Sequence, residues 1–396
     1  MTNAVIVDAV RTAGGKRNGR LSGWHPSDLA GEVLKALVAR NDLDPASIED
    51  VIMGCVMQVG SQGLNIGRNA VLAAGFPETV PATTVDRQCG SSQQSAHFAA
   101  QGVIAGAYDI VIAAGVEVMS TTPMGASITP GSIPFGPGVM ARYADQGGLV
   151  PQGISAELIA DKWGISREDL DGYGARSQQL GAQASDEGRF DNEIVPVGAR
   201  LWDKDKNEVV DLGEQHTKDE GIRAGTTAET LANLKPAFKP DGKVTAGNSS
   251  QICDGASAVL IMSEERANAL GLTPRARFHT FALAGVDPVT MLTGPIPATT
   301  KAFERSGLSM GDMDVIEINE AFASVVLAWE KEHHPDMAKV NPNGGAIALG
   351  HPLGGSGTKL MATMLNELER TGGRYGLQTM CEGGGLANAT IIERLG

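Results

Sequence analysis

The feature that most constrains the fold is an alternation of apolar strand segments with helical segments at both ends of the 396-residue chain. Near the start, the pattern predicts a strand over residues 4–10, a helix over 26–40 and a strand over 51–56. Such alternation is typical of α/β proteins, in which helices cover a largely parallel sheet. Further helices are predicted over 95–107, 299–306 and 358–370, and further strands over 109–115, 315–319 and 375–380.

The two ends of the chain also echo each other. The tripeptide Asp-Val-Ile at residues 50–52 returns at 314–316, and at the same spacing the glycine and serine of residues 90–92 return in 354–356. Each glycine–serine turn opens a predicted helix that leads to a strand. Because internal self-similarity is the signature of a repeated unit, we expect two duplicated α/β halves.

The amino-acid composition and pattern change between these halves, from about Thr121 to Ser250. Residues 122–139 are rich in proline and glycine, 155–187 are predicted to be helical, and the charged segment 203–219 is predicted to be a solvated surface. A stretch of this kind between two regular α/β regions indicates an inserted domain or a long functional loop.

The charge balance excludes some classes of partner. The chain has 32 basic and 46 acidic residues, a formal net charge of −14, so a polyanion such as DNA would be repelled. Its apolar runs fall short of the ~18 residues that a membrane span needs, and Asp8 interrupts the short apolar start. We therefore expect a cytoplasmic protein that binds neither nucleic acid nor membrane.

The four cysteines, Cys55, Cys89, Cys253 and Cys381, lie far apart in the sequence. They form no CxxC pair and no Cys/His spacing of the kind that holds zinc. We expect reduced thiols and no metal site, with some of the thiols available for chemistry.

Four segments stand at predicted junctions of strand, loop and helix: residues 89–92 (Cys-Gly-Ser-Ser), 319–323 (Asn-Glu-Ala-Phe-Ala), 350–354 (Gly-His-Pro-Leu-Gly) and 381–385 (Cys-Glu-Gly-Gly-Gly). In open α/β sheets such loops line the crevice in which ligands bind. A dinucleotide-binding fold is not indicated, because no G-x-G-x-x-G motif follows the first strand. A P-loop is not indicated either, because Gly14-Gly15-Lys16 lacks the P-loop spacing.

The residue types in these segments suit nucleophilic chemistry. Cys89 precedes a predicted helix, whose free N–H groups would stabilise a thiolate, although a small buried hydrophobe is an equal alternative. Cys381 precedes three glycines, which let backbone N–H groups approach a ligand, or simply form a turn. His351, held between glycine and proline, would activate a thiol. Asn319 follows a predicted strand, where its amide could orient a water molecule.

Taken together, these segments resemble the thiolase family. They occur in the family's order and spacing, accompanied by Asp-Ala-Val-Arg-Thr at residues 8–12 and Ala-Gly-Asn-Ser-Ser at 246–250. The resemblance covers nearly the whole chain. It implies duplicated α/β halves in an α-β-α-β-α layering with an inserted loop domain. The implied division is residues 1–120 plus 252–273 for the N-terminal half, 121–251 for the loop domain with its CoA and acyl pocket, and 274–396 for the C-terminal half.

The resemblance also implies the role of each residue. Cys89 would carry the acyl group, His351 would activate it, Cys381 would shuttle a proton at the α-carbon and Asn319 would hold a water. The backbone N–H groups of Cys89 and Gly383 would meet the oxyanion. Acyl-CoA and CoA would be the substrates, with no cofactor, in a homodimer or homotetramer. The implied CoA contacts are Arg223, Phe238, Ala246, Ser250 and Phe322.

Two departures from the family pattern bear on specificity. Pro151-Gln152 stand where acetoacetyl-specific thiolases generally carry His-Met, which favours longer or bulkier acyl chains. Residues 250–256 depart from the usual S-G-I-N-D-G-A, with Gln251 in the glycine position and Cys253 in the asparagine position. We interpret Cys253 as a packing variant.

The expected function is thiolytic cleavage of 3-ketoacyl-CoA to acetyl-CoA and a shortened acyl-CoA, in the β-oxidation of fatty acids or of other lipid or steroid side chains or rings. The first alternative is an acetoacetyl-CoA thiolase. A condensing ketoacyl synthase is disfavoured because Cys381 stands in the place of its second histidine. Outside these reactions, the alternatives are a CoA- or lipid-binding protein on this fold and a redox sensor built on Cys89 and Cys381.

Overall fold

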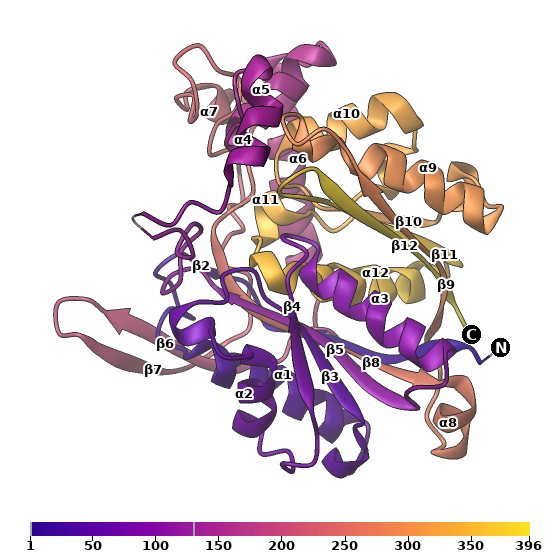
Figure 1. Cartoon of the computed structure of the whole chain (residues 1–396). Helices are drawn as coiled ribbons and strands as arrows, with labels where there is room; N and C mark the ends of the chain where they lie inside the picture. The colour runs from indigo at the N-terminus through magenta and orange to yellow at the C-terminus, as the bar shows by residue number, and fades with distance from the viewer. Residues whose placement is uncertain (1, 130) are drawn as a thin grey trace.

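A mixed ten-stranded sheet runs through the molecule in the computed structural model, which describes residues 2–129 and 131–396 (Figure 1). Its strand order is β10-β11-β12-β9-β1-β8-β5-β3-β4, with β2 paired to β8. The first four strands come from the C-terminal part of the chain. They join the others only where Val5 and Ile6 of β1 face Arg277 and Ala276 of β9. The sheet therefore consists of two half-sheets with a narrow junction.

The strands of the sheet are β1 (Ala4–Arg11), β2 (Gly15–Lys16), β3 (Asp50–Gly54), β4 (Ala82–Val85), β5 (Ile110–Val118), β8 (Cys253–Ser263), β9 (Ala276–Gly285), β10 (Val315–Ile318), β11 (Tyr375–Glu382) and β12 (Leu386–Arg394). A separate hairpin contains β6 (Val197–Asp203) and β7 (Glu208–His216). The helices are α1 (Pro26–Arg40), α2 (Ile66–Ala73), α3 (Ser91–Ile104), α4 (Pro137–Tyr143), α5 (Gln152–Lys162), α6 (Arg167–Asp186), α7 (Ala228–Ala232), α8 (Glu264–Ala269), α9 (Pro295–Ser306), α10 (Ala323–His333), α11 (Ala346–Leu349) and α12 (Ser356–Thr371).

Helices α3 and α12 form the central layer. They pack on each other, and α12 also packs on strands of both half-sheets. Helix α3 packs on one half-sheet and reaches the other through hydrogen bonds of Gln93 and His97 to Thr390 of β12. The core between them contains Ala96 and Val103 of α3, Met361 and Leu365 of α12, and strand residues such as Ile261. Helices α1 and α2 cover the outer face of one half-sheet, and α9 and α10 cover that of the other (Figure 1). The expected α-β-α-β-α layering is thus confirmed.

The echo in the sequence corresponds to equivalent elements in this layering. Residues 50–52 lie in β3 and 314–316 lead into β10, and both strands pair in parallel with a neighbour. Residues 90–92 and 354–356 begin the two central helices, α3 and α12. The turns singled out by the echo therefore place two helix N-termini in the middle of the molecule.

The inserted region differs from its prediction in the helical segment. The helical segment predicted over 155–187 is two helices, α5 and α6, separated by a turn. Gly164 takes a left-handed backbone (φ 60°), which ends α5, and Ser166 caps α6 together with Asp169. Figure 1 shows helices α4 to α7 grouped at one end of the molecule.

The charged segment 203–219 forms part of the β6–β7 hairpin, and most side chains of β7 are at least partly exposed, as expected for a solvated surface. Among the acidic and basic residues of the segment Asp219 is the exception, because its carboxylate is buried beside the buried guanidinium of Arg11, at 2.8 Å. Arg11 also contacts Glu193 at 2.5 Å. This end of the segment is therefore part of the core.

None of the helices in the described part of the chain is both long enough and apolar enough to cross a membrane.

Candidate active site

The two predicted thiols, Cys89 and Cys381, are both buried and lie close enough that a negative charge on Cys89 would raise the pKa of Cys381. Cys89 belongs to the loop between β4 and α3, and Cys381 to the end of β11. The residue before Cys89, Gln88, has a left-handed backbone (φ 49°), an uncommon conformation for a side chain of its type. This bend brings the chain into the helix immediately after Cys89.

The surroundings of Cys89 hold its sulfur as a neutral thiol in the resting protein. Burial, followed by the neighbouring carboxyl of Glu382, raises the pKa of Cys89 to about 12. Three hydrogen-bond donors oppose this shift: the backbone N–H groups of Cys89 and Gly383 and the side-chain amide of Gln152. The two N–H groups named from the family resemblance therefore converge on the sulfur, so that they face the position in which negative charge would develop.

His351 follows α11 and the left-handed Gly350 (φ 80°), which turns its ring into the core. Its Nδ1 lies 2.5 Å from the hydroxyl of Ser356, which donates its own hydrogen to the carbonyl of Pro352 at 3.0 Å. Because that hydroxyl has one hydrogen, it must accept from Nδ1–H. Nε2 is then the unprotonated nitrogen, available as a base.

The imidazole of His351 is neutral at physiological pH. Burial, followed by the positive charge of Lys359, lowers the pKa of His351 to about 3. The ammonium group of Lys359 donates to the carbonyls of Leu349 and Gly350, at 2.6 and 2.9 Å, and so also holds the loop that leads to the histidine. A neutral imidazole paired with neutral thiols is suited to taking a proton during reaction.

Asn319 completes the cluster one residue after β10. Its backbone N–H donates to Thr379 of β11 at 3.0 Å, and its side-chain nitrogen lies 3.4 Å from Nε2 of His351. Burial, followed by the charges of Cys89 and Glu382, raises the pKa of Cys381 well above its usual value. A hydrogen bond from the side-chain amide of Asn319 to Cys381 opposes this shift. Within the described residues the buried Oδ1 of Asn319 has no hydrogen-bond partner. This oxygen is available to a water molecule.

The residue after Asn319, Glu320, was not predicted as part of the site. Its buried carboxylate accepts hydrogen bonds from Tyr173 and Ser177 of α6, at 2.9 and 2.6 Å, and from the side chain of Asn341 and the N–H of Ile347, both at 3.0 Å. Glu320 thus fixes the Asn319 loop to the inserted region. An acid two residues after a buried strand was the available signal.

The predicted CoA contacts lie around the inserted region and reach the site through Phe322. The rings of Phe238 and Phe322 meet edge to face at 5.8 Å. The N–H of Ser250 donates to the carbonyl of Ala321 at 3.0 Å. Ala246 and the exposed Arg223 line one small cavity. The structure therefore arranges the five residues in two groups, one around the phenylalanine pair and one at that cavity.

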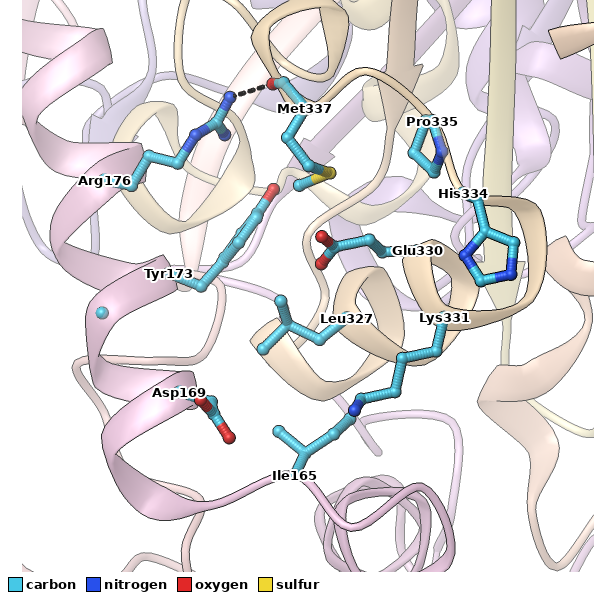
Figure 2. A pocket seen from close by; sticks show the side chains of 11 residues that line it. Ile165, Asp169, Tyr173, Arg176, Leu327, Glu330, Lys331, His334, Pro335 and Met337 are labelled. Atoms are coloured by element: carbon cyan, nitrogen blue, oxygen red, sulfur yellow. Dashed lines mark hydrogen bonds between the residues drawn. The ribbon is translucent and has the colours of Figure 1, made fainter.

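A cavity of about 660 Å³ lies elsewhere, between α6 and the end of α10 (Figure 2). Figure 2 shows Arg176 donating to the carbonyl of Met337 and Tyr173 projecting from the same helix. The predicted site residues do not line this cavity. Its link to the site is the hydroxyl of Tyr173, which donates to Glu320. In residues 2–129 and 131–396, no cluster of three metal-ligating side chains is found.

Comparison with known proteins shows the family of the chain. Residues 4–265 match the profile of the thiolase N-terminal domain and residues 272–394 that of the thiolase C-terminal domain. The chain is 50% identical to the steroid 3-ketoacyl-CoA thiolase FadA6 of Mycobacterium tuberculosis, over 100% of this chain and 95% of that protein. It is 43% identical to a 3-ketoacyl-CoA thiolase of Bacillus subtilis, over 99% and 100% of the two chains.

A solved structure is similar over the same extent. The acetyl-CoA acetyltransferase of Bacillus anthracis superposes with a TM-score of 0.89 at 40% identity, covering 100% of this chain and 99% of that one. The profile matches together span almost the whole sequence, and the relatives are similar from end to end. The chain belongs to the thiolase family.

Proposed function

We propose that this protein is a 3-ketoacyl-CoA thiolase, which cleaves 3-ketoacyl-CoA with CoA to give acetyl-CoA and an acyl-CoA shortened by two carbons. The observation that carries the proposal is the convergence of two thiols, a neutral imidazole and two backbone N–H groups at one buried site. The names of the similar proteins, including a steroid thiolase, support β-oxidation of fatty acids or of other lipid or steroid substrates.

In the first half-reaction, Nε2 of His351 takes the proton of Cys89, and the thiolate attacks the 3-keto carbon. The N–H groups of Cys89 and Gly383 stabilise the oxyanion that forms. The Cα–Cβ bond then breaks, leaving the acyl group on Cys89 and the enolate of acetyl-CoA. Nε2 of His351 and a water held by Asn319 stabilise the enolate oxygen, and Cys381 gives its proton to the α-carbon.

In the second half-reaction, the thiol of CoA attacks the acyl carbon on Cys89. Its proton returns to the thiolate of Cys381, and the shortened acyl-CoA leaves as Cys89 is released as a thiolate. Cys89 then takes back the proton held on Nε2 of His351, so the resting protonation states are restored. In the reverse direction Cys381 removes the α-proton of acetyl-CoA, which begins a Claisen condensation. Each preorganised donor at the oxyanion contributes about 3 kcal/mol. The reaction balances with CoA as a substrate and with no further cofactor.

The CoA molecule is proposed to bind along the inserted region. Phe238 and Phe322 supply an aromatic surface for the pantetheine chain, beside Ser250. Ala246 lines the same small cavity as Arg223. The exposed guanidinium of Arg223 would face the phosphates at the nucleotide end of CoA. The division of the chain proposed above is supported by β8, residues 253–263, which lies between β1 and β5 of the N-terminal half-sheet.

Acyl-chain length distinguishes this proposal from an acetoacetyl-CoA thiolase. Gln152 is the second residue of the pair Pro151-Gln152, which stands where short-chain enzymes carry His-Met. Its side chain contacts Cys89 and so helps to shape the acyl pocket. A methylene in an apolar pocket changes kcat/KM about 10- to 200-fold, so we expect longer or ring-bearing 3-ketoacyl-CoA esters to exceed acetoacetyl-CoA by at least about tenfold. Thiolysis rates across such a series provide the measurement.

A flat or falling series would instead favour the acetoacetyl-CoA thiolase, in line with the name of the Bacillus anthracis structure. Binding of CoA without turnover of any ester in the series would favour a CoA- or lipid-binding protein on this fold. The series therefore separates the three functions in one experiment.

The chain is proposed to form a homodimer or homotetramer. Strand β4 is an edge of the sheet, with β3 as its pairing neighbour, and such an edge can pair with a second copy. Several large apolar side chains between residues 124 and 140 are also exposed, namely Met124, Ile128, Ile133, Phe135, Val139 and Met140. Light scattering is expected to give two or four times the mass of the chain, 41.1 kDa, and a mass of one chain would refute the proposal.

We further propose that the reaction takes place in the cytoplasm. All four cysteines are free, which suits a reducing compartment.

A further inference from the structure

The four-residue helix α11 leads directly into the loop that carries His351, and it is too short to pair most of its own carbonyl groups. The carbonyl of Ala346 accepts from the N–H of Gly350 at 3.2 Å, but the later carbonyls of so short a helix need partners from elsewhere. The carbonyl of Ile347 accepts instead from two glutamine amides, Gln251 at 2.7 Å and Gln178 at 2.9 Å. Helix α11 is thus held by side chains from elsewhere in the chain.

The same two amides also hold the segment 221–223. The carbonyl of Gly221 accepts from Gln251 at 2.8 Å and from Gln178 at 3.4 Å. The side-chain oxygen of Gln178 accepts from the N–H of Arg223 at 2.7 Å. A Cβ on Gly221 would lie 2.4 Å from the carbonyl of Ala348, so this segment and α11 are in close backbone contact. Gln178 and Gln251 together therefore form a bridge, which we call the glutamine bridge.

The backbone of Gln251 adds a direct connection to the catalytic histidine. Its carbonyl accepts from the N–H of His351 at 3.1 Å, and its N–H donates to the carbonyl of Ala346 at 3.3 Å. Gln251 therefore contacts the first two residues of α11 and the histidine itself. The family usually has glycine at this position, which could make the backbone bonds but none of the side-chain bonds.

We propose that the glutamine bridge positions His351 relative to segment 221–223, so that the base and the nucleotide end of the CoA site are held in one arrangement. This rests on the proposed function for the role of His351 and of Arg223. Gln178 and Gln251 are positioning residues, since they act through α11 and through segment 221–223. The bridge joins helix α6 of the inserted region, the segment at Gln251 that precedes strand β8, and the C-terminal half around α11.

The test replaces each amide by an apolar side chain of similar size, in Q251L and Q178L. The matched control is Q183L, because Gln183 is an exposed residue of the same helix as Gln178 and bonds only to Glu187. We expect Q251L to lower kcat/KM for thiolysis about tenfold, with both a lower kcat and a higher KM for CoA, since buried carbonyls lose their partners. Q183L is expected to match the unsubstituted protein.

The two bridge variants should also be non-additive, because the amides share two carbonyls. The double variant Q178L/Q251L is expected to lose less than the product of the single losses. Q251G, which introduces the residue usual in the family, serves as a second variant if Q251L does not fold. Kinetic constants that stay at the level of the unsubstituted protein in Q251L or Q251G, with only a lower Tm, would overturn the proposal.

Failure of the proposed function gives a different result. If the unsubstituted protein cleaves no 3-ketoacyl-CoA, that function is wrong, and the bridge is then judged on CoA binding by calorimetry. An affinity about tenfold weaker in Q251L than in Q183L supports the bridge as an organiser of segment 221–223. Equal affinities overturn it.

Discussion

Cys89→Ala is expected to abolish thiolysis, with kcat lower by about 10⁴-fold or more, because no other group can carry the acyl chain. The fold should persist, since Cys89 lies in a loop and alanine fills most of the space of its side chain. Thiolysis kcat with a 3-ketoacyl-CoA ester, together with the Tm of the variant, provides the measurement.

Cys253→Ala is the matched control for this loss. Its thiol is buried and the pKa of Cys253 is raised to about 12 by burial, much like that of Cys89, but it bonds only to a backbone carbonyl. We expect its kcat to remain within a few-fold of the unsubstituted protein. Comparable turnover by Cys89→Ala, or a loss in Cys253→Ala as large as that expected for Cys89→Ala, would show that the nucleophile is misassigned.

Cys381→Ala should separate proton transfer from acyl transfer. Without the second thiol, exchange of the α-protons of acetyl-CoA with solvent is expected to fall about 10²- to 10⁴-fold, the usual contribution of a positioned acid or base. Some acyl-enzyme should still form, because Cys89, His351 and both N–H donors remain. Proton exchange is measured in deuterated water by NMR of the acetyl group. Formation of the acyl-enzyme is measured by mass spectrometry.

The serine variant at the same position refines this test. Cys381→Ser keeps a small hydroxyl beside Asn319 but raises the pKa of the acid far above that of a thiol, so its exchange should also be slow. Unimpaired α-proton exchange in both variants would show that another group, rather than Cys381, moves the proton.

Much of the fold follows from local patterns in the sequence. Helix α1 has the bounds predicted from its periodicity, residues 26–40, and strand β10 lies within the predicted 315–319. These elements depend on alternation of apolar and polar positions over one segment, which a single sequence displays. The break between α5 and α6 was missed because it depends on one left-handed glycine and one serine cap inside a long helical pattern.

The residues that meet at the candidate site could be singled out from the sequence, but their hydrogen-bond partners could not. Cysteine, histidine and asparagine stand out by residue type at strand–loop–helix junctions. Ser356, which fixes the tautomer of His351, and Glu320, which accepts four hydrogen bonds, do not stand out by type. The repeat of residues 90–92 at 354–356 indicated that a helix begins near Ser356. It gave no indication that the Ser356 hydroxyl would hydrogen-bond to the imidazole of His351.

Asp219 illustrates the same point for charge. As the end of a charged segment it was predicted to be solvated, yet it pairs in the core with Arg11, 208 positions away in the sequence. A charged residue is stable in the interior only with such a partner, and the partner is brought to it by tertiary folding. Pairings over that distance are not visible in the local pattern.

The most direct test of the account is to trap the acyl-enzyme. The protein is mixed with a 3-ketoacyl-CoA ester in the absence of free CoA, quenched in acid within one turnover, digested and mapped by mass spectrometry. One shortened acyl group per active site is expected on the peptide that contains Cys89, with one equivalent of acetyl-CoA released. Acyl label on Cys381 instead, or release of acetyl-CoA with no labelled cysteine, would contradict it.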